Sequence, residues 1–304
     1  MKTLTIIGCG KVGTTLACLW RRAGVFGIGQ ILNQSLSSAG KAAGRIGRGE
    51  AAESFAGLKE ADLFMISASD GRIAECCRRL CETGLDLKGK VVFHCSGSLP
   101  SAILEPARRK GAAVASVHPV KSFADIDGAV RSFEGTFCAV EGDAAAIETL
   151  SDGLAKIGAK IFAIDPGAKA IYHTAAVFAS NYLVAVIEAG LRCYEQAGVQ
   201  RKDGLAILEP IVGGTVANLF RLGPEQALTG PIARGEAEVV RGHLEALTGW
   251  DPELAVLYRN LGRVALDLAA ARGNVPEEAL AEIGKLLEPG AASLSPGHKE
   301  DRAG

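Results

Sequence analysis

Three glycines near the N-terminus have the types and spacing of a phosphate-binding turn. They are Gly8, Gly10 and Gly13. They follow the apolar run 4–7 and open the helical pattern 12–22. Gly8 permits a tight turn, Gly10 leaves the backbone open to a ligand, and Gly13 lets the helix pack closely on its strand. Because the free N–H groups of a helix start point at one place, a pyrophosphate is stabilised there. A dinucleotide site is therefore expected, the alternative being an ordinary glycine turn.

The end of the second expected strand indicates which dinucleotide binds. A carboxylate about 20 residues beyond the last glycine would accept hydrogen bonds from the ribose of NAD. No Asp or Glu occurs between Lys11 and Arg48, and the strand 28–33 is followed by Gln34 and Ser35. Lys41 and Arg45 lie four residues apart on the next helix, behind a cap at Ser37 or Ser38, where both could face a 2′-phosphate. NADP is favoured over NAD, unless these cations form only a solvated face.

The first half of the chain alternates strands and helices, which predicts an α/β doubly wound, Rossmann-like sheet covered on both faces. Strands are expected at 4–7, 28–33, 61–67, 90–94, 112–117, 135–140 and 160–164. Helices are expected between them at 12–22, 72–82, 100–110 and 143–157. The cofactor domain is thus assigned to residues 1–165.

Polar residues end several of these strands, at the edge where open parallel sheets bind ligands. The cofactor residues expected on the sequence are Gly8, Gly10, Lys11, Val12, Gly13, Gln34, Ser35, Lys41, Arg45, Ser67, Asp70, Ser96 and Gly97. Asp70 could equally cap the next helix, and Ser96 and Gly97 could be turn residues. His118, followed by Pro119, is either a substrate-binding group or a histidine hydrogen-bonded within the core.

Beyond residue 165 every pattern is helical, which predicts an all-α second domain at 166–287 and a disordered tail at 288–304. The helix expected at 168–197 is apolar around much of its circumference, so it needs cover on more than one side. We expect a homodimer through this domain. Further helices are expected at 202–222, 236–248, 252–271 and 276–287.

A polar stripe in this long helix is the best candidate for chemistry. Lys169, His173 and Ser180 are separated by one and two helical turns, with Asn181 beside them. Reduction of a carbonyl needs a proton donor and hydrogen bonds to the developing oxyanion, which an imidazole and an amide supply. The alternative is a buried polar network that holds the domains together.

A glycine- and proline-rich segment, 228–235, separates two later helices. Arg234 could bind a substrate carboxylate with two hydrogen bonds, and Thr229 could add a hydroxyl. A surface arginine in a connecting loop is the alternative.

The composition excludes several classes of protein. The 304 residues are 48% hydrophobic and 22% charged, with a formal net charge of −1. The chain therefore has no overall excess of positive charge that would attract nucleic acid or an anionic membrane. No segment is expected to span a membrane, and a core strand at the N-terminus leaves no room for a signal peptide, so a cytoplasmic protein is expected. The eight cysteines lack the spacing of a metal site and are expected to be free.

These motifs together resemble a known family. The glycine turn, His118-Pro119, the run 169–181 and the segment 229–235 are similar to a bacterial family that pairs a Rossmann-like domain with a helical C-terminal domain of unknown function. The wider relatives of that family are ketopantoate reductases, pyrroline-5-carboxylate reductases and 3-hydroxyacid dehydrogenases. The resemblance covers residues 1–287 and implies an NADPH-dependent reductase of a small 2-oxo acid, most concretely ketopantoate in pantothenate synthesis.

The chain also differs from the pattern of these relatives at several positions. Common ketopantoate reductases carry a lysine and two asparagines at four-residue intervals, where this chain has His173, Val177 and Asn181. The proton donor is then His173 or Lys169. Gln34 stands where relatives that use NADP often have arginine. One alternative is an imine reductase. Another is an enzyme similar to prephenate dehydrogenase, which also has a serine and a His-Pro pair at the places of Ser96 and His118-Pro119. The third is a non-catalytic NADP(H) sensor or scaffold.

Overall fold

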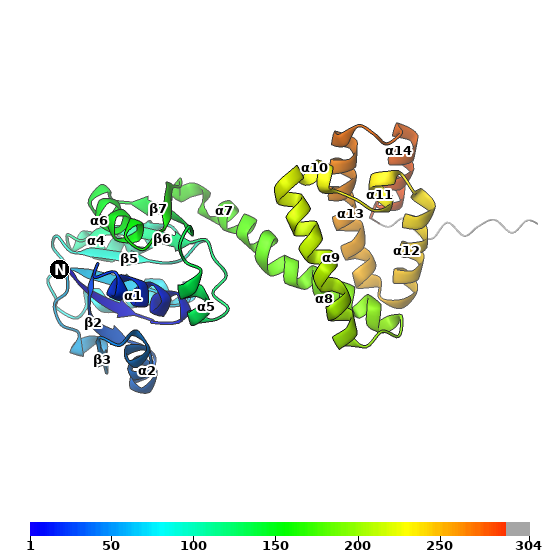
Figure 1. The fold of residues 1–304 in the computed structure, drawn as a ribbon. Helices are drawn as coiled ribbons and strands as arrows, with labels where there is room; N and C mark the ends of the chain where they lie inside the picture. The colour runs from blue at the N-terminus through cyan, green and yellow to red at the C-terminus, as the bar shows by residue number, and fades with distance from the viewer. Residues whose placement is uncertain (290–304) are drawn as a thin grey trace, which may run out of the picture. The chain divides into compact units, whose positions relative to one another are not determined.

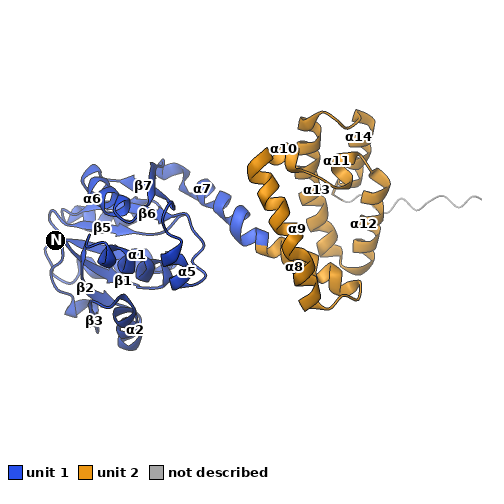
Figure 2. Ribbon diagram, in the orientation of Figure 1, with its two compact units in different colours: residues 1–183 blue, residues 184–304 orange. Residues whose placement is uncertain are grey.

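A computed structural model describes residues 1–289, and the chain divides into two compact units after residue 183 (Figure 2). The tail expected to be disordered, from 290 onward, lies outside the described residues. The boundary is 18 residues later than the expected one at 165, because the first turns of the long helix pack on the sheet. Each unit is described by itself.

The first unit is built on one eight-stranded sheet with the order β3-β2-β1-β4-β5-β6-β7-β8 (Figure 1). Its strands are β1 (Thr3–Ile7), β2 (Gly27–Leu32), β3 (Glu50–Ala52), β4 (Leu63–Ile66), β5 (Val91–His94), β6 (Ala113–Pro119), β7 (Phe137–Gly142) and β8 (Lys160–Ala163). Its helices are α1 (Lys11–Arg22), α2 (Leu36–Ile46), α3 (Asp70–Cys81), α4 (Glu105–Arg109), α5 (Ile126–Arg131), α6 (Ala144–Ala155) and α7 (Lys169–Ala176). The expected α/β Rossmann-like sheet is confirmed.

Alternating side chains place a separate core on each face of this sheet, because successive residues of a strand point to opposite faces. Ile6 and Met65 join one core with side chains of α1, α2 and α6. Ile7 and Ile66 join the other with side chains of α3 and of the turn and helix before β6. Both faces are therefore buried, which explains why the strands read as nearly continuous apolar runs.

Strand β1 marks the point where the strand order reverses. Ile7 at its end pairs with Leu32 of β2 on one side and with Ile66 of β4 on the other. All three strands run parallel, so their carboxyl ends meet at one edge of the sheet. Dinucleotides bind at this position in doubly wound folds.

Two features of the sheet differ from the sequence expectation. β7 runs antiparallel to β6, since the connection between them contains only the short α5, which packs on α1, and no full crossover helix. The three-residue β3 and the six-residue α5 were not predicted. Both are too short to show a periodic pattern.

The second unit is all-helical over its described residues. It contains α8 (Tyr182–Gln196), α9 (Arg201–Leu222), α10 (Pro224–Ala227), α11 (Pro231–Arg234), α12 (Ala237–Trp250), α13 (Pro252–Arg272) and α14 (Glu277–Leu286). Val240, Leu244 and Ile283 are at the centre of its core, which α11 to α14 form. The four long helices expected here are confirmed. The single turn α11 lies in the segment 228–235 that was expected to be irregular, and the single turn α10, just before that segment, was not predicted.

The long helix expected at 168–197 is present but not uniform. α7 and α8 are joined by a π-helical turn, Val177–Asn181, and a glycine with a φ of 86°, Gly198, follows the helix. Its apolar side chains are largely exposed. Phe178, Val184 and, on the following helix α9, Phe220 are 62%, 68% and 86% exposed.

Two helical segments, Pro166–Gln196 and Arg201–Leu222, are long and apolar enough to cross a membrane. The expectation that no segment reaches this length was wrong. Length and composition alone do not distinguish a membrane span from a helix that another protein surface covers.

Candidate active site

The glycine turn lies at the carboxyl end of β1 and borders a cavity of about 920 Å³. Gly8 has a φ of 81°, and a Cβ there would lie 2.7 Å from the backbone of Ala68. A Cβ on Gly13 would lie 2.3 Å from Oγ of Ser67, whereas one on Gly10 would meet no atom within 4 Å. Gly8 and Gly13 therefore close the turn against β4, and Gly10 keeps its backbone open toward the cavity, as the sequence predicted.

The turn is also fixed by side chains from the neighbouring strand ends. Asn33 accepts a hydrogen bond of 2.6 Å from the backbone N–H of Cys9. Ser67 donates one of 2.9 Å to the carbonyl oxygen of Gly8. Ser67 thus borders the cavity and shapes the turn at the same time.

Cationic side chains dominate the charged lining of the cavity. Those among its described lining residues are Lys11, Lys41, Arg45, Arg72 and Arg79, against one acid, Glu53. Lys11 donates a hydrogen bond of 2.7 Å to the carbonyl oxygen of Ala124, and Arg45 pairs with Asp127 of α5 at 2.6 Å. This charge favours a polyanionic ligand.

Several cofactor residues expected from the sequence do not border this cavity. Those that border the cavity are Gly8, Gly10, Lys11, Gln34, Lys41, Arg45 and Ser67; those that do not are Val12, Gly13, Ser35, Asp70, Ser96 and Gly97. Ser35, rather than Ser37 or Ser38, caps α2 by accepting the N–H of Ser38 at 3.2 Å. Asp70 is the first residue of α3 and accepts a hydrogen bond of 2.6 Å from Ser98.

Three lining residues that sequence reasoning missed lie on one face of α3. Arg72, Cys76 and Arg79 follow the i, i+4, i+7 spacing that places residues on a common stripe. The guanidinium of Arg79 lies 4.3 Å from the ring centroid of Phe55, another lining residue. The helical spacing was visible in the sequence, but only the strand order shows that this face borders the ligand edge.

A second cluster, of aromatic and imidazole rings, lies at the end of β6. Nδ1 of His118 lies 2.8 Å from the hydroxyl of Tyr172 on α7. The rings of His118 and His173 pack edge to face with centroids 5.7 Å apart. A Cβ on Gly97 would lie 2.4 Å from the ring of His173 and 2.8 Å from that of His118. The absence of a side chain at Gly97 thus lets both imidazoles approach the strand end after β5.

Burial sets the protonation of His118 and Tyr172 in this cluster. It lowers the pKa of His118 to about 4, and the nearby His173 and Lys169 act in the same direction, against Asp70. Burial also raises the pKa of Tyr172 to about 12. His118 is therefore neutral and Tyr172 protonated near neutral pH.

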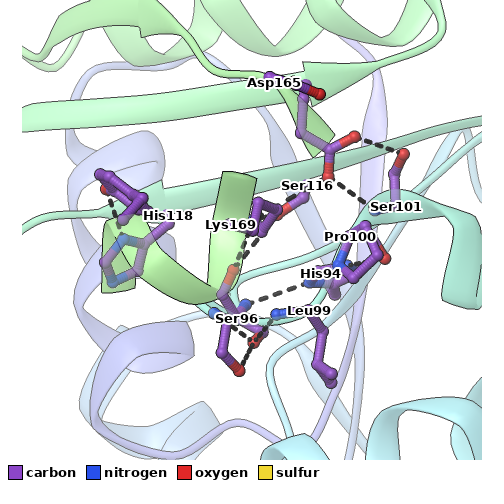
Figure 3. Close-up of polar contacts among 12 residues, drawn as sticks. His94, Ser96, Leu99, Pro100, Ser101, Ser116, His118, Asp165 and Lys169 are labelled. Carbon is purple, nitrogen blue, oxygen red and sulfur yellow. Dashed lines mark hydrogen bonds and ion pairs between the residues drawn. The ribbon is translucent and has the colours of Figure 1, made fainter. Parts of the chain in front are cut away.

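Lys169 does not reach this cluster as a free proton donor. It is 1% exposed, and its ammonium donates hydrogen bonds to Ser96 O at 3.0 Å and to Ser116 Oγ at 2.5 Å (Figure 3). Glu141 lies 3.9 Å away and accepts both the N–H and the hydroxyl of Ser101. Burial lowers the pKa of Lys169, which Glu141 opposes. Lys169 therefore ties α7 to the sheet, and of the two expected donors His173 fits the geometry better.

Ser96 and His94 have structural partners in the same loop. Oγ of Ser96 accepts the N–H groups of Ser98 and Leu99 at 3.2 and 3.0 Å. Nδ1 of His94 accepts the N–H of Ser96, and its Nε2 lies 3.3 Å from Pro100 O. Ser96 thus forms the turn that positions Gly97, which is the role weighed against cofactor binding.

The polar stripe of the long helix is not buried as a whole. Lys169 is buried, His173 is half-buried, and Ser180 and Asn181 are exposed. The π-helical turn at Val177–Asn181 holds one extra residue, which rotates the following helix by about 100° relative to a continuous α-helix. Asn181 rather than Ser180 then continues the stripe of Lys169 and His173.

Thr229 and Arg234 belong to the second unit. Arg234 on α11 makes two hydrogen bonds of 2.8 Å to the carboxylate of Glu236. Its guanidinium therefore has the geometry to bind a carboxylate with two hydrogen bonds, and in this structure that carboxylate is Glu236 of the same unit.

Comparisons with known proteins agree with this architecture. Residues 2–119 match the family described as a Rossmann-like domain, and residues 136–265 match the family described as Domain of unknown function (DUF2520). The comparison with curated proteins gave no match.

Solved structures extend the similarity over most of the chain. Protein TM1727 from Thermotoga maritima is 26% identical with a TM-score of 0.70, covering 88% of this chain and 99% of that one. BF3122 from Bacteroides fragilis, whose assignment as an NADP oxidoreductase is provisional, is 22% identical with a TM-score of 0.70, covering 87% and 97%. An imine reductase from Myxococcus stipitatus, solved with NADP+, is 17% identical with a TM-score of 0.63, covering 92% and 99%.

The resemblance seen in the sequence is thus confirmed, and the solved neighbours that share the fold include NADP(H) oxidoreductases. The chain combines a Rossmann-like domain with a domain of the DUF2520 family.

Proposed function

We propose that this protein is a cytoplasmic NADPH-dependent reductase of a small 2-oxo acid, with ketopantoate as the most concrete substrate. The observation that supports it most is the cavity at the reversal of the strand order. This cavity combines an open glycine turn with five cationic side chains. A polyanionic dinucleotide matches both its position and its charge.

The residues of the cavity fit NADP. The glycine turn and Lys11 would hold the pyrophosphate at the start of α1, and Lys41 with Ser38 would hold the 2′-phosphate. Arg45 is paired with Asp127, so it contributes to the 2′-phosphate only where that pair opens. The planar pair of Phe55 and Arg79 offers a stacking surface for the adenine.

The ring cluster at the end of β6 would bind the substrate and supply its proton. The cofactor supplies a hydride to the carbonyl carbon, so the oxygen gains an electron pair and needs a proton. His173 is proposed to give that proton, with Asn181 nearby on the same stripe to stabilise the oxyanion. Neutral His118 would hydrogen-bond the substrate oxygen.

The test is a panel of compounds with purified protein and NADPH. Ketopantoate, other 2-oxo acids and cyclic imines are compared by the loss of NADPH absorbance, with NADH as control. Oxidation with ketopantoate supports the proposal, whereas oxidation with imines alone moves the substrate class to an imine reductase. Prephenate with NADP+ tests the dehydrogenase alternative. NADPH binding without oxidation by any compound favours a sensor or scaffold.

We also propose a homodimer through the helical domain. The exposed apolar side chains of α8 and α9, among them Val184 and Phe220, support it because soluble proteins rarely leave such faces uncovered. Sedimentation should give a dimer that Phe220→Asp converts to a monomer, with Val239→Asp on α12 as control. A protein that stays monomeric, or that purifies only with detergent, contradicts the proposal.

A further inference from the structure

The direction of the hydrogen bond between His118 and Tyr172 determines the tautomer of His118. Nδ1 of His118 lies 2.8 Å from the phenolic oxygen, and the two rings meet edge to face at 87°. Either Tyr172 donates its proton to Nδ1, or His118 donates from Nδ1 to the phenolic oxygen. These two arrangements leave different atoms at the other side of the imidazole.

The chemistry of the two groups favours the first arrangement. Within residues 1–289 the hydroxyl has no hydrogen-bond partner besides His118. A phenol hydroxyl is a stronger hydrogen-bond donor than a neutral imidazole N–H, and an imidazole nitrogen is a stronger acceptor than a phenolic oxygen, so the arrangement in which Tyr172 donates to Nδ1 is favoured. A protonated tyrosine and a neutral imidazole, which burial favours here, are the pair that lets Tyr172 donate.

Nε2 of His118 points the other way. It lies 2.8 Å from the position that a Cβ on Gly97 would occupy, a space that glycine leaves open, and it has no hydrogen-bond partner among the described residues. Phe162 of β8 packs against Tyr172 with ring centroids 6.1 Å apart and so holds the phenol in place. The charged and titratable groups around His118 are His173 and Lys169 from α7 and Asp70 from α3.

We propose that Tyr172 is a positioning residue that holds His118 in the tautomer with its proton on Nε2, so that His118 presents an N–H donor to the substrate oxygen. This inference rests on the proposed function and adds a division of roles within it. His118 donates a hydrogen bond without giving up its proton, and His173 supplies the proton to the oxygen. A donor fixed before the substrate arrives stabilises the developing oxyanion without reorganisation.

The experiment combines nitrogen NMR of ¹⁵N-histidine-labelled protein with kinetics, because the chemical shifts of the two ring nitrogens report the tautomer without any turnover. The His118 signals are assigned by their loss in His118→Gln. In the wild-type protein near neutral pH we expect the proton on Nε2. In Tyr172→Phe, which keeps the ring that packs on Phe162, we expect a mixture of both tautomers. Its kcat should fall about tenfold, as for the loss of one hydrogen bond, with an unchanged Kd for NADPH.

A matched control exists in the second unit. His243 and Tyr258 form the same kind of pair, with Nδ1 3.0 Å from the hydroxyl. Tyr258→Phe should change the His243 signals and leave those of His118 and the kcat unchanged. A proton on Nδ1 of His118 in the wild-type protein, or an unchanged tautomer in Tyr172→Phe, overturns the proposal. If no compound is reduced at all, the proposed function fails while the tautomer result still decides the role of Tyr172.

Discussion

The ammonium of Lys169 lies 3.9 Å from the carboxylate of Glu141, and both side chains are almost fully buried. Hydrogen bonds to Ser96 O and Ser116 Oγ complete the surroundings of Lys169. This arrangement joins the first turn of α7 to the ends of β5, β6 and β7. It places His173, one turn further on, beside His118.

Removing the lysine should therefore be costly. Lys169→Ala leaves Glu141 buried without its cation, and a broken buried pair costs about 3–5 kcal/mol. Lys156→Ala, which removes an exposed pair with Asp152, should change the free energy of unfolding by less than about 1 kcal/mol. Urea unfolding of both variants measures the difference. Equal stabilities would show that the Lys169 network does not hold α7 in place.

Acid should destabilise the protein through its buried histidines. Burial lowers the pKa of His94 from 6.5 to about 4, so the unfolded chain binds more protons between these values. Stability then falls as the pH falls through this window, by about 2 kcal/mol between pH 7.5 and pH 5 for His94 alone. Urea unfolding across this range should show a shallower pH dependence for His94→Asn, whose amide oxygen can still accept a hydrogen bond. The same slope in both proteins would argue against a neutral buried His94.

A side chain at Gly97 should displace the rings of His118 and His173 and leave the cofactor cavity unchanged. The Cβ of Gly97→Ala would meet both imidazoles at under 3 Å and push them apart. We expect kcat to fall by about tenfold or more with little change in the Kd for NADPH, since Gly97 does not border the cavity. Gly242→Ala, whose Cβ would meet nothing within 4 Å, serves as control. An unchanged kcat would place the chemistry away from these rings.

Removing a cationic side chain from the cavity should weaken the binding of NADPH more than that of NADH. Lys41→Ala removes a charged partner of the 2′-phosphate, so the Kd for NADPH should rise about tenfold and that for NADH less than about twofold. Lys88→Ala removes an exposed charge outside the cavity and controls for net charge. Binding of each nucleotide is followed by fluorescence titration. Equal effects on both nucleotides would remove Lys41 from the 2′-phosphate site.

The sequence predicted the parts of this fold that have strong local signals. The glycine turn, the parallel strands of the first half and the long helices of the second unit follow from periodicity and from glycine positions. The antiparallel pairing of β7 with β6 did not follow, because the direction of a strand depends on how its connection packs and not on its own residues.

The candidate site was predicted in its residue types and less well in their roles. The place of Lys169 on a polar stripe predicts a proton donor. Its burial against Ser116 and Glu141 could not be predicted, because it depends on contacts between distant segments of the chain. Ser180 reads as a member of that stripe only if the helix is regular, and the π-helical turn before Tyr182 changes the register. Tyr172 was adjacent to the candidate histidine in sequence, yet its partner is His118, 54 residues away.

The most direct test of the reductase is to follow the hydride itself. NADPH deuterated at C4 of the nicotinamide is incubated with ketopantoate and the protein, and the 2-hydroxy acid product is analysed by mass spectrometry. We predict one deuterium at C2 of the product, at a rate that His173→Ala lowers by on the order of a hundredfold. A protein that binds NADPH but transfers no deuterium to ketopantoate, to any other 2-oxo acid or to a cyclic imine would contradict the assignment as a reductase.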